Sequence, residues 1–213
     1  MNVIDAIMND SDISLDYARE VSCFIIPEHG IISSTTNNSS GSVEFDWLTI
    51  KDKIWELKEK GQCPEYICMI HTHPPYLNAM SGIDRNMVYG WCMALNIPIL
   101  FIVLTEEDFI PYRCELKDKK VKIERLHICS DYMFDMWDAR IVWQIMYGAS
   151  KAKTLTNEDL SNIVLTINSS GVNFKKIVNP LMNDVEDNNL TEEQQKQLEE
   201  VLSESIGKFE CNF

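Results

Sequence analysis

The residues whose types and spacing could support chemistry lie between residues 71 and 84. His71 and His73 stand two residues apart, directly after the apolar residues 66–70, which are typical of a short strand. Because residues i and i+2 of a strand point to the same side, the two imidazoles can face one point. Asp84 follows in the first turn of a predicted helix, so its carboxylate can return to the same point. The spacing therefore predicts a cluster of two imidazoles and one carboxylate.

Such a cluster is a ligand set that suits Zn²⁺ and leaves a fourth position for water. Zinc lowers the pKa of a bound water to about 7, which makes a hydroxide nucleophile at neutral pH. Ser81 lies three residues before Asp84 and could stabilise the oxyanion that forms when a carbonyl is attacked. Simpler interpretations exist for each residue alone: a His pair two apart is often coincidental, and Ser81 and Asp84 also suit a helix cap. The joint spacing carries the prediction.

The joint spacing, H-x-H-P-x6-S-x2-D, resembles the signature of the JAMM (MPN+) metalloprotease family. Members of that family are zinc-dependent isopeptidases and peptidases, including deubiquitinases and tail-assembly peptidases of bacteriophages. The resemblance extends over about residues 17–116. It implies an α/β fold, namely an MPN (JAB) domain with a mixed β-sheet flanked by helices, related to the cytidine deaminases and followed here by a mostly helical C-terminal extension. It also implies that His71, His73 and Asp84 hold Zn²⁺ and that Ser81 binds the oxyanion.

The family pattern adds a general base, a Glu on an earlier strand. Glu20 stands at the helix-to-strand junction where that Glu is expected, and it would take a proton from water and pass it to the leaving amine. Many relatives have Gly about two residues after the Glu, whereas this chain has Ser22 followed by Cys23. Glu28 is the alternative base, but it lies beyond the strand beside Gly30, where a turn is expected. Position favours Glu20, and the choice between the two stays open at this point.

The elements that must position these residues follow from the hydrophobic pattern. Apolar, β-rich segments predict strands at 21–27, 31–36, 66–70 and 98–104, with a hairpin of 109–116 and 121–128 turning at 117–120. Helical spacing predicts helices at 45–60, 83–95, 131–147, 157–167 and 191–206, with shorter helical turns within 3–19. We therefore expect a JAMM/MPN+ metalloprotease domain over residues 1–130 and a helical C-terminal extension over residues 131–213.

Composition limits the classes of partner. The chain has 19 Lys+Arg against 33 Asp+Glu, a net charge of −14, which argues against binding nucleic acid or an anionic membrane. Residues 155–206 carry ten acidic and three basic side chains, which favours partners with basic surfaces. The seven Cys include no C-x-x-C pair, and the longest apolar segment, 97–104, is far too short to cross a membrane. With no signal-peptide pattern at the N-terminus, we expect a reducing, cytoplasmic location.

The resemblance implies a zinc-dependent isopeptidase or peptidase. Its protein substrate would be the tail of a ubiquitin-like protein or a peptide bond in an assembly partner. The alternative is an MPN-type interaction or assembly subunit, for example in phage tail assembly, with weak or latent catalysis and a protein partner bound by the C-terminal helices. A zinc deaminase is the third hypothesis, but the H-x-E and P-C-x-x-C signature that such an enzyme needs does not occur. His29 and His127 are isolated in the sequence, and we expect them to be surface or structural residues.

Overall fold

Six strands form one mixed sheet in the computed structural model of the chain. The structure describes residues 19–36, 43–74, 77–105, 109–126, 149, 155–176 and 182, all within the first of two units, residues 1–182. The elements, in chain order, are β1 (Val21–Ile26), β2 (Gly30–Thr36), α2 (Trp47–Glu59), β3 (Ile67–Thr72), α3 (Gly82–Leu95), β4 (Ile99–Leu104), β5 (Phe109–Lys117), β6 (Lys120–Arg125) and α6 (Asn157–Ser169).

The strand order is β2-β1-β3-β4-β5-β6. The β3–β4 pair is parallel and every other neighbouring pair is antiparallel. Parallel strands cannot be joined by a tight hairpin and need a crossover, which α3 supplies between β3 and β4. The prediction of an α/β fold with a mixed sheet flanked by helices is confirmed at this level.

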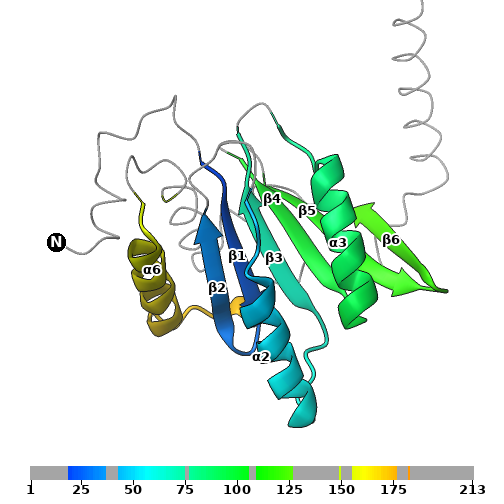
Figure 1. The fold of residues 1–213 in the computed structure, drawn as a ribbon, viewed down its shortest axis with the longest axis horizontal. Coiled ribbons are helices and arrows are strands. Elements are labelled where there is room, and N and C mark those ends of the chain that lie inside the picture. The colour runs from blue at the N-terminus through cyan, green and yellow to red at the C-terminus, as the bar shows by residue number, and fades with distance from the viewer. Residues whose placement is uncertain are drawn as a thin grey trace, which may run out of the picture. The chain divides into compact units, whose positions relative to one another are not determined.

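The core lies between the sheet and the helices α2 and α3, which cover one face (Figure 1). The central strands β1, β3 and β4 are buried along their whole length, as expected for strands covered on both faces. Their alternate side chains, including Phe24, Met69 and Phe101, belong to the cluster that packs under α2 and α3. Because side chains alternate along a strand, the same face carries Glu20 and Ser22 before Phe24, and His71 and His73 after Met69. The candidate site residues therefore continue the core layer at one end of the sheet.

Helix α6 packs beside the edge strand β2 (Figure 1). Its Asn168 side chain accepts a hydrogen bond from the Ile31 backbone N–H and donates one to the Ile31 carbonyl, both at 2.8 Å. Gly30, next to Ile31, has φ +80°, and a Cβ at that position would lie 2.5 Å from Asn168 Oδ1. Glycine is therefore required here both by the backbone angle and by the close approach of α6.

The described elements follow the predicted ranges closely. Helix α2 ends where Gly61 was expected to stop it, with Gly61 at φ +68°. The predicted turn at 117–120 is confirmed, with positive φ angles at Asp118 and Lys119. An irregularity in the β1–β2 pairing between Phe24 and Ile25 was not predicted.

Several predicted segments lie outside the described residues. These are the helical turns within 3–18, the last residues of the hairpin beyond 126, and the helices at 131–147 and 191–206. The boundary between residues 130 and 131 likewise stays a prediction. Within the described part of the chain, no helix combines the length and apolarity needed to cross a membrane.

Candidate metal centre and adjoining acid

The two histidines lie at the carboxyl end of β3. His71 is in the strand and His73 directly follows it, held in line by a 2.8 Å hydrogen bond from its backbone N–H to the Leu104 carbonyl. Both side chains are buried, and their Nε2 atoms lie 2.5 Å apart. The ring of Phe101 contacts His71 edge-on at a centroid distance of 5.2 Å. The predicted convergence of the two imidazoles is therefore present in the structure.

Asp84 joins this pair from the first turn of α3. Its Oδ1 lies 3.7 Å from His71 Nε2 and its Oδ2 lies 3.4 Å from His73 Nε2. A capping box orients the carboxylate: the Ser81 backbone N–H donates to Asp84 Oδ2 at 2.7 Å, and the Asp84 N–H donates to Ser81 Oγ at 3.2 Å. The cap interpretation and the ligand interpretation of Asp84 are thus compatible, because the cap points the carboxylate at the histidines.

Burial and charge set the protonation of the three groups. Burial lowers the pKa of His71 to about 4, so this imidazole is neutral at neutral pH. Burial alone would raise the pKa of Asp84, but hydrogen bonds from His73 and Ser81, and the positive charge that His71 gains in acid, lower it to about 2. Burial alone would lower the pKa of His73, yet its bonds to Asp84 and to the Leu77 carbonyl raise it above the usual value.

These three residues could hold a metal ion. Two imidazole nitrogens 2.5 Å apart are closer than the roughly 2.9 Å of an ordinary N–H hydrogen bond, and a carboxylate faces both. The Nδ1 atom of His71 is buried without a hydrogen-bond partner, so this ring is not held in place by a bond at its other nitrogen. A cation that both Nε2 atoms face would accept their lone pairs and offset the carboxylate charge. Two imidazoles and a carboxylate are donors that suit Zn²⁺ and related transition metals.

Glu20 lies beside this cluster and directly precedes β1. The β1–β3 register pairs Ser22 with His71, and extending it by two residues places Glu20 opposite His73. The residue is only 5% exposed. Burial raises the pKa of Glu20 to about 7, with His73 opposing the shift and Asp84 adding to it. A carboxyl group with a pKa near neutrality can both accept and release a proton.

Ser81 is the N-cap of α3 and lies at the edge of the same cluster, half-buried. Its hydroxyl oxygen accepts the Asp84 N–H. Because a hydroxyl accepts and donates at once, its own proton remains a donor for a group placed next to Asp84.

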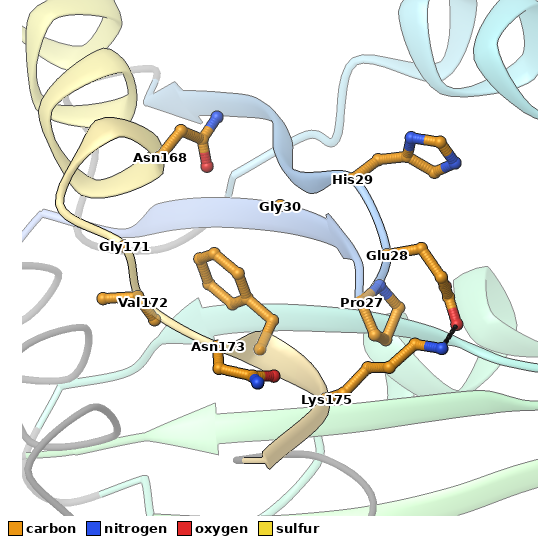
Figure 2. A pocket seen from close by; sticks show the side chains of 10 residues that line it. Pro27, Glu28, His29, Gly30, Asn168, Gly171, Val172, Asn173 and Lys175 are labelled. Carbon is orange, nitrogen blue, oxygen red and sulfur yellow. Dashed lines mark ion pairs between the residues drawn. The ribbon is translucent and has the colours of Figure 1, made fainter.

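Glu28 lies at the opposite end of β1, in the β1–β2 turn. Its carboxylate forms a 2.8 Å ion pair with Lys175 (Figure 2). Both residues line an open cavity of about 630 Å³ between this turn and the segment after α6. The six residues of β1 separate the turn from Glu20 by about 20 Å. The structure thus brings Glu20, and not Glu28, to the His71–His73–Asp84 cluster.

Sequence reasoning did not identify two residues that contact this site from the core. Phe45 stacks near His71 at a centroid distance of 6.3 Å, and Phe101 contacts it edge-on. Phe101 is placed by the parallel register that pairs it with Met69, and residue spacing within one segment carries no such information. Both rings are buried, so the inner side of the cluster is apolar, which strengthens the electrostatic interactions within it.

A scan of the sequence against protein-family models finds no match, and a search of curated proteins finds no significant match. The functional interpretation therefore depends on the motif spacing and on the geometry of the site.

Proposed function

We propose that this chain is a zinc-dependent peptidase or isopeptidase of the JAMM (MPN+) type. One observation carries the proposal: a buried His71–His73–Asp84 cluster lies beside a buried acid, Glu20, whose pKa is near neutrality. A purely structural arrangement would pair a buried acid with a cation or keep it exposed. The motif spacing that resembles the family supports the same conclusion independently.

His71 Nε2, His73 Nε2 and one carboxylate oxygen of Asp84 would hold the zinc ion. When bound, zinc would polarise the substrate carbonyl and make water a stronger acid. The capping box sets the direction of the Asp84 carboxylate before any metal arrives. Phe45 and Phe101 keep the inner side of the site apolar.

The chain's own groups would then carry the proton transfers. The Glu20 carboxylate would take one proton from the water whose oxygen bonds to the carbonyl carbon. It would return that proton to the nitrogen as the C–N bond breaks, leaving a carboxylic acid and an amine. The Ser81 hydroxyl would donate a hydrogen bond to the carbonyl oxygen while that oxygen carries negative charge.

The proposed substrate is a protein, either the tail of a ubiquitin-like protein or a peptide bond in an assembly partner. A reducing, cytoplasmic location belongs to the proposal as well. Free thiols at the buried residues Cys23, Cys68, Cys92 and Cys114 agree with it.

The test combines metal content with cleavage. Protein purified without added metal is analysed for zinc. It is then incubated with a linear ubiquitin–reporter fusion and with a proteome-derived peptide library, each with and without a chelator. We expect about one zinc per chain, and cleavage that the chelator removes and added zinc restores. Stoichiometric zinc without chelator-sensitive cleavage of either probe would overturn the peptidase proposal and favour an interaction subunit. A chain that binds no zinc would overturn the metal site itself.

A further inference from the structure

We propose that Thr72 is a positioning residue that fixes Glu20 against the metal ligands. Its hydroxyl bonds to the main chain on both sides of Glu20, while His71 precedes it in β3 and His73 directly follows it. This inference rests on the proposed function, in which Glu20 is the general base. Thr72 would touch neither substrate nor metal. It would act only by fixing the position of the Glu20 carboxylate.

The backbone ladder between β1 and β3 ends before it reaches Glu20. Its last pair is Ser22 with His71. Beyond that pair, the Thr72 Oγ1 accepts a hydrogen bond from the Val21 backbone N–H at 2.9 Å and donates one to the Arg19 carbonyl at 3.3 Å. A side chain therefore replaces the backbone ladder at the position where the catalytic acid must be held.

Thr72 is suited to this role by its place on β3. It lies between the two histidines, so its side chain points to the opposite face of the sheet and does not compete for the metal site. The backbone of this part of β3 is fixed to β4, by the pairing of Thr72 with Leu104 and by the bond from the His73 N–H to the Leu104 carbonyl. The histidines and the contact that holds Glu20 thus share one rigid segment.

Strand β2, the other neighbour of β1, also binds Glu20. The Thr36 Oγ1, at the end of β2, donates a hydrogen bond to the Glu20 carbonyl at 2.9 Å. Glu20 and its two flanking peptide groups are therefore bound from both adjacent strands. Thr72 is 1% exposed, so water does not readily replace its bonds. Loss of its hydroxyl would leave the buried Val21 N–H without this acceptor, and the contacts with β2 would then hold the start of β1 less firmly.

The experiment compares Thr72→Val, which keeps the side-chain shape, with Thr72→Ser, which keeps the hydroxyl. Thr166→Val is the matched control, because the Thr166 hydroxyl also bonds to a backbone carbonyl, that of Asn162, but at a half-buried position of α6 away from the candidate site. Each variant is assayed for zinc affinity, for kcat and KM on whichever probe the wild type cleaves, and for hydrogen exchange of the Val21 amide without metal. Thr36→Val provides a second test in case Thr72→Val does not fold.

We expect Thr72→Val to lower kcat about 10- to 100-fold, the cost of misplacing a catalytic group by about 1 Å. KM and zinc affinity should stay within about threefold of wild type, because the ligands are unchanged. Thr72→Ser should restore most of kcat, Thr166→Val should resemble wild type, and Thr36→Val should lower kcat by a smaller factor. In a Glu20→Gln background, Thr72→Val should cause no further loss, since its effect passes through Glu20.

Two outcomes would overturn the inference. One is a wild-type kcat in the folded Thr72→Val protein. The other is an equal loss of activity with and without Glu20, which would show a general structural effect. If the wild type cleaves no probe, the proposed hydrolysis fails on its own. The hydrogen-exchange measurement then tests separately whether Thr72 holds the start of β1. Faster exchange of the Val21 amide in Thr72→Val, but not in Thr72→Ser, would support the inference. Unchanged exchange would refute it.

Discussion

The two ends of strand β1 carry the same kinds of residue in opposite settings. At its start, Glu20 is buried beside His71, His73 and Asp84, and its pKa is raised to about 7. At its far end, Glu28 is exposed, lies next to the exposed His29, and forms an ion pair with Lys175. The acid at the far end has its charge neutralised by Lys175 in solvent, whereas burial is the main influence on the acid at the start and raises its pKa. Reactivity is expected where burial withholds such neutralisation.

The open cavity and the cluster of reactive side chains lie at different ends of β1. The cavity of about 630 Å³ lies at the Glu28 end, lined by turn residues and by the segment after α6. The group of His, Asp and Glu side chains lies at the other end, packed against the aromatic rings of the core. The convergence of buried polar atoms, and not open volume, identifies the candidate site in this chain.

The largest contrast is expected between His73 and His29. His73→Ala removes one of the three proposed metal ligands, so zinc affinity should fall by more than about 100-fold, a larger loss than is expected for residues that only support the ligands. His29→Ala should leave zinc affinity unchanged. Titration of each protein with zinc against a competing chelator measures both. Similar zinc affinity in the two variants would break the distinction between the two ends.

The next contrast separates the two acids. Glu20→Gln should lower kcat by about 10²- to 10⁴-fold, because the amide cannot accept or return the proton. Zinc content should not change, since Glu20 is not a ligand in the proposed site. Glu28→Gln should retain wild-type kcat. The measurement is steady-state cleavage of the ubiquitin–reporter fusion or of a cleaved peptide, with zinc analysed in the same samples. A Glu20→Gln protein of wild-type rate would exclude Glu20 as the base.

A third contrast concerns stability and uses one glycine from each end. Gly30→Ala places a Cβ on a backbone with φ +80° and 2.5 Å from Asn168 Oδ1, which should lower the free energy of unfolding by about 3 kcal/mol. Gly82 begins α3 beside the candidate site, and a Cβ there meets nothing within 4 Å. Gly82→Ala should keep the free energy of unfolding or raise it by up to about 1 kcal/mol. Urea unfolding measures both, and equal losses would contradict the structure around Asn168.

The smallest effect is expected for the ion pair at the Glu28 end. Lys175→Met removes the partner of Glu28, but both side chains are substantially exposed and solvent replaces the interaction. The thermal midpoint of the variant should match that of the wild type, and zinc affinity should not change. A clear drop in the midpoint would show that this end depends on the pair for its stability.

Much of the scaffold could be predicted from local patterns in the sequence. The two-residue spacing of His71 and His73 after an apolar strand, and Asp84 in the first turn of a helix, are local features, and the structure places these three side chains together. Position relative to the strand also favoured Glu20 over Glu28, and only Glu20 lies beside the cluster. The roles of Glu20, Ser81 and zinc remain predictions that the experiments above address.

The remaining features depend on contacts between distant segments. Thr72 and Val21 are 51 residues apart, and Asn168 and Ile31 are 137 residues apart. Neither pair has a periodic signature, because a single hydrogen bond places no constraint on the neighbouring residue types. The order of the strands and the irregularity between Phe24 and Ile25 are likewise properties of the assembled sheet.

The Asn168 side chain has a consequence for the behaviour of the protein at high concentration. An edge strand offers unpaired N–H and C=O groups on which a strand of another chain can add, and such addition leads to aggregation. At Ile31 in β2 both groups are already bonded to an amide that resembles a peptide group. The Asn168 side chain of α6 therefore occupies the free edge of β2 at Ile31 and prevents β2 from pairing there with a second copy of the chain.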